Sequence, residues 1–311
     1  MRDNTKGIFA QRKDSLCRLK MSKILFIGDI VGKPGRKILR EVLPQWKEKY
    51  KPDVVIVNVE NLAHGKGVTP STLAEIDQLD IDCFTSGNHI FDKKEQVEEC
   101  FEKYPKLIRP ANLPASMPGH GYYRLSKSVV SPFMGSDADN TADKSANYNA
   151  KNQQFLIINL HGQIFCEKFF DGQITNPFLA IDQILTQEGQ KGDIIIVDFH
   201  AEATSEKKTF GFYVDGRVAA VVGTHTHVPT GDAHILTKGT GYISDAGMTG
   251  SRDSALGVKF PNALAKFLDP NAKFKGEMEE DGVLQINGVL VEVESQKLKV
   301  KSIEKLYQEV T

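Results

Sequence analysis

Short runs of apolar and β-branched residues recur along the chain, and polar or amphipathic segments separate them. In the N-terminal third, apolar runs are followed by segments with apolar positions at helical spacing, the order expected of βα units. Runs of this kind belong to strands that are buried on both faces. Six runs are predicted as buried strands: Ile24–Ile27, Asp53–Val59, Cys83–Ser86, Phe155–Leu160, Asp193–Asp198 and Val218–Val222.

Helical connections are predicted between these strands, and two prolines affect the first of them. Pro34 suits the first turn of a helix, whereas Pro44 removes a backbone donor within it and is expected to kink or split it. The alternation of strands and helices indicates a layered α/β fold in which helices flank the sheets. The predicted helices are Gly35–Tyr50 and Thr69–Leu79, and helical or turn connections are predicted at Pro177–Thr186 and near Ser205–Phe210.

The C-terminal segment Gly282–Val300 has a different pattern, in which apolar and polar positions alternate. It contains Asn287-Gly288, a dipeptide typical of a two-residue hairpin turn. We therefore expect an antiparallel hairpin that turns at this dipeptide. The sheets are then mixed rather than purely parallel.

Two polar segments indicate how the chain is organised. Residues 1–20 are charged and precede the first strand signal, which follows Met21 directly, so they are predicted to form a flexible extension. Residues 131–154 are polar and lack periodicity, which predicts a surface loop or an insertion. Because the strands on both sides of that stretch are of the buried type, a single domain over residues 21–311 is predicted.

Composition favours a cytoplasmic protein. The 39 Lys+Arg and 40 Asp+Glu residues give a formal charge of -1, which argues against a stable nucleic-acid complex but is compatible with a small anionic substrate. The four cysteines lack CxxC spacing, and no apolar run approaches the roughly 18 residues of a membrane span. The N-terminus also lacks the apolar core of a signal peptide. We expect no membrane partner, and a homo-oligomer is compatible with the sequence.

Side chains able to bind metals follow five of the predicted strands. In an open α/β sheet the carboxyl ends of the strands meet along one edge, where ligands bind. Each group alone has an ordinary explanation as a helix cap, a turn residue or a buried histidine. Their recurrence at successive strand ends instead predicts one shared site. The groups are Asp29, Glu60 with Asn61, Asn88 with His89, His200, and His225 with His227.

These groups combine carboxylate, amide and imidazole ligands without a thiolate. Such a set suits manganese, iron or zinc. If the strand continued through His225 and His227, both imidazoles would face the same side. The ligands are too many for one tetrahedral ion but fit two ions about 3.5–4 Å apart, which hold the attacking and leaving oxygens of a phosphoryl transfer. The predicted chemistry is phosphoester hydrolysis.

The order of these residues resembles the calcineurin-like metallophosphoesterase superfamily. There are two departures: Ile30-Val31 follows Asp29 where the superfamily has Asp-x-His, and Glu60-Asn61 replaces the usual bridging aspartate. These departures, together with the segments "GDIVGKPGR", "NVENLAHGKG" and "GMTG", resemble the sequence pattern of the bacterial YmdB-type branch. Members of that branch hydrolyse cyclic nucleotides, notably 2′,3′-cyclic nucleotides. The matching segments are "GD" (28–29), "NVEN" (58–61), "GNHIFD" (87–92), "DFHAEATSEK" (198–207) and "GTHTHVPTGD" (223–232).

This resemblance implies a metallophosphoesterase-like sandwich that holds two divalent or mixed-valence metal ions, iron or manganese before others. Glu60 is implied as the bridge between the ions. His89 is implied as the general acid that protonates the leaving ribose oxygen while a bridging hydroxide attacks phosphorus from the opposite side. The implied ligands are Asp29, Glu60, Asn61 and His227 for one ion, and Glu60, Asn88, His200 and His225 for the other.

Other polar residues near these motifs are weaker candidates. Asp198 is a candidate partner of His200, and Asp92 either orients His89 or caps a helix. Substrate contact is conceivable for His64, Lys33, Arg36 and the turn Gly247–Gly250, although ordinary surface or turn roles are expected for them. Structural or solvated roles are expected for His120, His161 and His234.

Two alternatives to a cyclic-nucleotide phosphodiesterase are consistent with the same residues. One is a phosphomonoesterase or nucleotidase that uses the same site. The other is a non-catalytic regulatory protein that binds a nucleotide. The presence of His89 argues against this last alternative, because a protein that only binds needs no acid.

Overall fold

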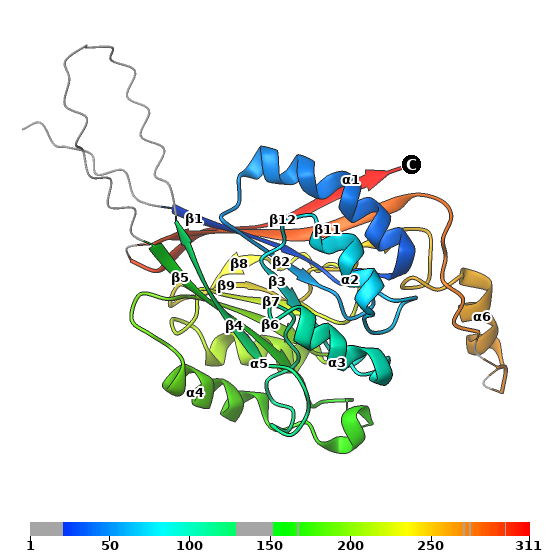
Figure 1. Ribbon diagram of the computed structural model, residues 1–311, viewed down its shortest axis with the longest axis horizontal. Coiled ribbons are helices and arrows are strands. Elements are labelled where there is room, and N and C mark those ends of the chain that lie inside the picture. The colour runs from blue at the N-terminus through cyan, green and yellow to red at the C-terminus, as the bar shows by residue number, and fades with distance from the viewer. Residues whose placement is uncertain (1–20, 129–151, 167, 270, 274, 296) are drawn as a thin grey trace, which may run out of the picture.

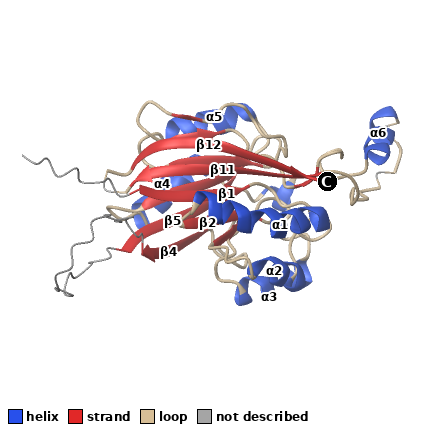
Figure 2. Cartoon of the chain, turned by 90° about the horizontal axis from the view of Figure 1, so that it is seen from above, coloured by secondary structure: helices blue, strands red, loops and turns tan. Residues whose placement is uncertain are grey.

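Two six-stranded sheets lie face to face in the computed structural model, which describes all residues except 1–20, 129–151, 167, 270, 274 and 296. Helices cover the outer faces of the sheets, so the described part of the chain is layered (Figures 1 and 2). Both sheets contain parallel and antiparallel pairs. The prediction of a layered α/β fold with mixed sheets flanked by helices is confirmed.

The first sheet has the strand order β10-β11-β1-β2-β3, and β12 pairs with β11. Strands β1, β2 and β3 are parallel, whereas β11 is antiparallel to β1 and to β12. The bounds are β1 Met21–Ile27, β2 Val54–Asn58, β3 Cys83–Thr85, β10 Gly250–Ser251, β11 Leu284–Glu294 and β12 Lys299–Val310.

The second sheet has the order β4-β5-β6-β7-β9-β8. Its four central strands are parallel, and both edge strands are antiparallel to their neighbours. The bounds are β4 Tyr122–Ser128, β5 Asn152–His161, β6 Ile194–His200, β7 Ala220–Thr224, β8 His234–Ile235 and β9 Gly241–Ile243.

Alternation along the strands divides the core into layers. In β1, Ile24 and Phe26 pack against the second sheet, whereas Leu25 and Ile27 pack on the other face with residues of α1. This follows from the two-residue period of a strand. The helices are α1 Gly32–Tyr50, α2 Pro70–Asp77, α3 Lys94–Lys103, α4 Pro177–Gln187, α5 Thr204–Tyr213 and α6 Phe260–Leu268, with a short 3₁₀ helix η1 over Phe169–Gly172.

The prediction of an antiparallel strand pair in the C-terminal segment is confirmed, but the position of the turn, and with it the bounds of the two strands, was wrong. Asn287-Gly288 lies inside β11, and the chain reverses between β11 and β12, after Glu294. The Asn287 side chain donates to the Met248 carbonyl at 2.7 Å. A Cβ on Gly288 would lie 2.8 Å from the Phe26 carbonyl oxygen. The glycine therefore allows close packing of strands, a tertiary requirement that resembles a turn signal in the sequence.

Pro44 does not split the first helix, because α1 continues from Gly32 to Tyr50 with Pro44 inside it. The apolar face of α1, which includes Ile38, Val42 and Trp46, is buried. Packing of this face offsets the lost backbone hydrogen bond. The predicted flexible extension, residues 1–20, and most of the predicted insertion lie outside the described residues. Within the described residues, no helix has the length and apolar character needed to span a bilayer.

Candidate active site

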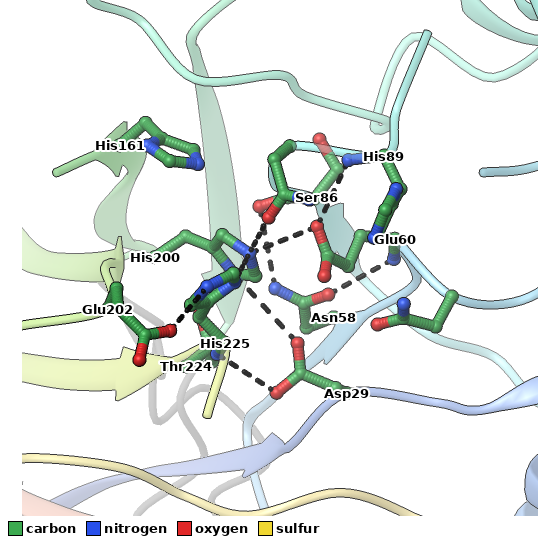
Figure 3. Close-up of polar contacts among 12 residues, drawn as sticks. Asp29, Asn58, Glu60, Ser86, His89, His161, His200, Glu202, Thr224 and His225 are labelled. Carbon is green, nitrogen blue, oxygen red and sulfur yellow. Dashed lines mark hydrogen bonds and ion pairs between the residues drawn. The ribbon is translucent and has the colours of Figure 1, made fainter. Parts of the chain in front are cut away.

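The metal-capable side chains predicted from the sequence lie together where the carboxyl ends of strands from both sheets meet (Figure 3). Asp29 follows β1, Glu60 follows β2, and Asn88 follows β3 in the first sheet. His200 ends β6 and His225 follows β7 in the second sheet. Asp29 and His200 are fully buried, and Glu60 is 1% exposed. Such burial of charged and polar groups requires partners within the site.

The potential ligand atoms form two groups that share Glu60. One group contains Glu60, His200 and His225, and the other contains Asp29, Glu60 and His227. Within each group the ligand atoms lie within 4.8 Å of one another. The two asparagines adjoin these groups: Asn88 Oδ1 is 3.0 Å from His200 Nε2, and Asn61 Oδ1 is 3.3 Å from His227 Nε2. The structure thus brings together all seven predicted ligands.

The remaining nitrogen of each of the three imidazoles has a partner outside these groups. His200 Nδ1 contacts Thr224 Oγ1 at 2.9 Å, and His227 Nδ1 contacts the Leu256 carbonyl at 3.3 Å. His225 Nε2 lies 2.9 Å from a carboxylate oxygen of Glu202. Each of these contacts places the ring proton on the outer nitrogen. The inner nitrogens, His200 Nε2, His225 Nδ1 and His227 Nε2, therefore present lone pairs to the centre.

Acceptors consequently face one another at short distance. His200 Nε2 is 3.0 Å from His225 Nδ1 and 3.0 Å from Glu60 Oε2. With the ring protons on the outer nitrogens, no proton lies between these atoms. Asp29 Oδ1 is also buried without a hydrogen-bond partner among the described residues. A cluster of converging acceptors of this kind is stabilised by a cation, and its nitrogen and oxygen donors fit a transition metal.

Gly87 permits this convergence. A Cβ at position 87 would lie 2.2 Å from Glu60 Oε2 and 2.3 Å from His200 Nε2. Any side chain would thus displace the shared carboxylate and the buried imidazole. The glycine in the "GNH" motif is required by this close approach.

A family model described as "YmdB-like protein" matches residues 25–306 of this chain. The chain is 39% identical, over 284 residues, to the 2′,3′-cyclic-nucleotide 2′-phosphodiesterase of Bacillus subtilis (strain 168), covering 91% of this chain and 96% of that protein. The chain belongs to the YmdB-like family. The family resemblance inferred from the motifs is confirmed.

Two solved structures share the fold of this chain. The crystal structure of a novel phosphatase from Mycoplasma pneumoniae has a TM-score of 0.78 and 31% identity, and the match covers 94% of each chain. A 5′-nucleotidase precursor from Thermus thermophilus has a TM-score of 0.54 at 12% identity over 92% of this chain and 54% of that chain, which shows a shared fold only. The Bacillus subtilis relative is named as a phosphodiesterase, so its reaction is phosphoester hydrolysis. This is the class of chemistry predicted from the sequence.

The two histidines of "GTHTH" in this YmdB-like chain are placed differently from the extended-strand expectation. Strand β7 ends at Thr224, and His225 and His227 have φ angles of 99° and 67°. Asp245 holds this segment by accepting hydrogen bonds from Thr226 N and Oγ1. Strain of this kind persists where surrounding contacts fix the backbone. The bend directs the two imidazoles into the two different groups of potential ligands.

A hydrogen-bond relay supports His200 from behind. Thr224 Oγ1 donates to Asp198 Oδ1 at 2.6 Å while it contacts His200 Nδ1. Asp198 also accepts from Asn58 Nδ2 at 2.9 Å, and burial raises the pKa of Asp198 to about 7. The suggested link from Asp198 to His200 is therefore indirect, through a threonine that had not been identified from the sequence. Little in the local sequence identifies Thr224 as a partner of His200, since Thr224 is only the residue before the first histidine of the "GTHTH" motif.

The Thr224→Val variant is expected to bind metal about 10–100-fold more weakly, because the ring orientation and tautomer of His200 lose their support. Metal titration followed by calorimetry measures this loss. Thr240→Val is the matched control: Thr240 is buried and donates to the Val218 carbonyl, and it has no contact with a predicted ligand. Equal metal affinities for the two variants would contradict the relay.

Burial shapes the protonation of this centre. It raises the pKa of Asp29 well above its ordinary value, and the nearby charge of Glu60 adds to this effect. Burial lowers the pKa of His225 to about 2 and that of His200 well below its ordinary value. It also lowers the pKa of His227. The imidazoles are thus neutral and ready to act as ligands.

Metal-free protein is therefore expected to lose stability as the pH falls from 7 to 5. In the unfolded chain a histidine binds a proton below about pH 6.5, whereas His225 in the folded state does not. The free energy of unfolding therefore falls by about 1.4 kcal/mol for each such histidine with each pH unit below that value. The imidazoles of His161, His200 and His227, whose pKa is also lowered, act in the same direction as His225, whereas the raised pKa of Asp29 and Asp198 acts in the opposite direction.

Urea unfolding in EDTA across this pH range tests the expectation. The His225→Asn variant should unfold with about one proton less, and thus with a shallower pH dependence. The exposed His234 supplies the control substitution His234→Asn. A slope that does not differ between the His225→Asn variant and the parent would contradict the assigned direction.

His89, the predicted acid, lies beside the two groups of potential ligands. Its backbone N–H is 3.4 Å from Glu60 Oε2, and its Nδ1 is 2.9 Å from Asp92 Oδ2. The N-cap of α3 is Lys93, so Asp92 orients His89 and does not cap that helix. With Nδ1 bound to this carboxylate, Nε2 is the nitrogen available to a substrate.

The weaker candidates have other partners. Lys33 pairs with Glu280, and Arg36 pairs with Glu75 and donates to the Leu62 carbonyl. The turn at 247–250 supports the ligand-bearing loops, since the Thr249 amide donates to the Asp29 carbonyl and the Met248 amide to the His227 carbonyl. His64 lines a surface depression with Lys259 and Met278.

His161 is more closely associated with the site than the sequence indicated. It ends β5 opposite His200 in the sheet, and the two ring centroids are 5.3 Å apart. Its Nδ1 contacts the Gly162 carbonyl at 2.6 Å, while the buried Nε2 has no hydrogen-bond partner within the described part of the chain. The same strand-end argument that identified His200 applies to this residue, because it follows the apolar run Phe155–Leu160.

Proposed function

We propose that this chain is a two-metal phosphodiesterase that hydrolyses small cyclic phosphodiesters, in particular 2′,3′-cyclic nucleotides. The observation that carries this proposal is the pair of ligand groups that share Glu60, with His89 beside them. The name of the Bacillus subtilis relative supports the substrate class. Near-neutral charge fits a small anionic substrate rather than a nucleic acid.

Iron or manganese is the proposed metal, because the donors are carboxylate, amide and imidazole groups without thiolate. Two such ions supply Lewis-acid charge to the phosphate and lower the pKa of a water molecule. The first ion would be held by Asp29, Glu60, Asn61 and His227. The second would be held by Glu60, Asn88, His200 and His225.

The residues of the chain then have distinct roles in the reaction. The bond between phosphorus and one ribose oxygen breaks as a water oxygen bonds to phosphorus. His89 gives its proton to the departing ribose oxygen, and Asp92 holds the imidazole in place. The product is a nucleoside monophosphate in which one further ribose hydroxyl has been freed, so atoms balance with one water consumed.

The deciding experiment is hydrolysis of 2′,3′-cyclic AMP with added Mn²⁺, for the parent and for Asn88→Ala. Asn88 is 5% exposed and borders the second ligand group, so its variant should retain the fold but lose turnover. Asn176→Ala, which removes an N-cap of α4, is the matched control and should retain turnover.

Other outcomes identify the alternatives. Rapid turnover of adenosine 5′-monophosphate, with none of the cyclic diester, would favour a nucleotidase. Nucleotide binding in calorimetry without any product would favour a regulatory binding protein. Either result from a folded, metal-loaded parent would contradict the proposal.

A further inference from the structure

An aromatic side chain covers the candidate active site on the side of His89. The segment between β5 and α4 contains the 3₁₀ helix η1, which begins at Phe169. The Phe169 ring centroid lies 6.3 Å from that of His89, 6.1 Å from that of His161 and 6.5 Å from that of His225. A single ring is thus in contact with three imidazoles contributed by three different strand ends.

The segment that carries Phe169 is anchored to the fold. The buried carboxylate of Glu206 accepts from the amides of Gln163 and Ile164, and the Thr175 amide donates to the Asn112 carbonyl. Phe169 packs against a small apolar cluster formed by Leu113, Cys166 and Ile174. Its ring is therefore held in place from behind, while another side faces the imidazoles.

The neighbouring aromatic ring extends this apolar surface. Phe170 makes edge contacts with Phe91 at 6.0 Å and with His161 at 5.9 Å. Phe170 and Asp171 have φ angles of 51° and 52°, so the backbone turns sharply at this point. Consecutive left-handed residues are unfavourable, and the turn keeps the two rings on the site.

The position of His89 indicates which part of a substrate would meet this surface. A general acid lies next to the leaving oxygen, and in a 2′,3′-cyclic nucleotide that oxygen remains on the nucleoside. The nucleoside must therefore lie on the His89 side of the phosphate. Phe169 is the aromatic ring in contact with His89 on that side.

We infer that Phe169 is a specificity-determining residue, whose ring packs against the base of a nucleotide substrate. This inference rests on the proposed function. Aromatic side chains bind bases by stacking with little dependence on base identity. The chain is thus expected to accept several 2′,3′-cyclic nucleotides and to discriminate against cyclic diesters that lack a base.

The test compares Phe169→Leu and Phe169→Trp with the parent on two substrates. One is 2′,3′-cyclic AMP, and the other is glycerol 1,2-cyclic phosphate, which has the same five-membered diester without a base. Phe169→Leu should lower kcat/KM for the nucleotide about 5- to 100-fold, mainly through KM, and leave the glycerol compound unchanged. Phe169→Trp should restore most of this loss.

Phe165→Leu is the matched control, because Phe165 lies on the same segment and is 70% exposed. It should behave as the parent does. Equal losses on both substrates would show that Phe169 only supports the histidines and would overturn the inference. Equal gains would show that the ring obstructs the site and would overturn it as well.

Binding measurements separate this inference from the proposed activity. Calorimetry should show that Phe169→Leu weakens the binding of adenosine 3′-monophosphate and leaves the binding of inorganic phosphate unchanged. If the parent hydrolyses neither cyclic diester but shows this pattern, the proposed activity fails and the base-binding surface stands. If both affinities are unchanged by the substitution, the inference fails whatever the activity.

Discussion

The Glu60→Gln variant is expected to lose about three orders of magnitude of metal-dependent phosphodiesterase activity. Glu60 is the residue shared by both ligand groups, and an amide cannot supply the negative charge that holds two cations. Metal ions contribute several kcal/mol to phosphoryl transfer, and each 1.4 kcal/mol is about a factor of ten in rate. The measurement is kcat/KM for 2′,3′-cyclic AMP together with bound metal per chain.

The same substitution should have the opposite effect on the metal-free protein. The charge of Glu60 adds to the burial that raises the pKa of the Asp29 carboxyl, and the Glu60 oxygens face the lone pair of His200 Nε2. The amide of glutamine removes this charge and offers N–H donors to the surrounding acceptors. In EDTA the variant should therefore melt at or above the temperature of the parent, and added Mn²⁺ should no longer raise its melting temperature.

A half-buried glutamate outside the candidate site provides the control for both measurements. Glu75 pairs with Arg36 and Arg40 between α1 and α2, and Glu75→Gln should change neither the activity nor the response to Mn²⁺. If Glu60→Gln retained two ions per chain and more than a tenth of the parent activity, Glu60 would not be the bridge.

The second large effect is expected for His89→Asn, with a loss of about 10²–10⁴-fold in kcat on 2′,3′-cyclic AMP. The ribose oxygen is a poor leaving group and needs a proton, whereas 4-nitrophenolate leaves without one. The loss on bis(4-nitrophenyl) phosphate should therefore be much smaller. Metal content should not change, because His89 is outside both ligand groups.

Asp92→Asn gives a graded version of this test. The amide keeps contact with His89 Nδ1 but removes the charge that orients and stabilises the protonated ring. Asp92→Asn should also lower kcat more on 2′,3′-cyclic AMP than on bis(4-nitrophenyl) phosphate. The loss should be smaller than that of His89→Asn. If His89→Asn slowed both substrates equally, or lost metal, the imidazole would be a structural or ligating residue rather than the acid.

The strands and their polar ends could be predicted from the sequence because both signals are local. Apolar runs such as the one in β1 identify buried strands, and the residue that follows each strand occupies the carboxyl edge of the sheet. Asp29, Glu60 and His200 were located in this way, without knowledge of which strands pair. The approximate positions of the helices could be predicted for the same reason, because the spacing of apolar residues over a few turns is also a local signal.

The turn at Asn287-Gly288 was predicted wrongly, and of the two effects expected of Pro44 the split does not occur, because tertiary contacts override local preference at both positions. Gly288 packs on the Phe26 carbonyl of β1, a contact between residues more than 250 positions apart. The buried face of α1 keeps that helix continuous across its proline. Neither contact leaves a recognisable signal near the residue itself.

By itself, the sequence determined the layered fold, the family and the seven candidate ligands, since each depends on local residue patterns along the strands and helices or at the strand ends. Only the tertiary structure decided which ring nitrogens face inward, because Thr224, Glu202 and Leu256 approach them from other segments. It also decided that Phe169, in a segment without an obvious motif, lies over the site. Hydrogen bonds and packing between distant segments fix the direction of a side chain, and local sequence patterns do not contain that information.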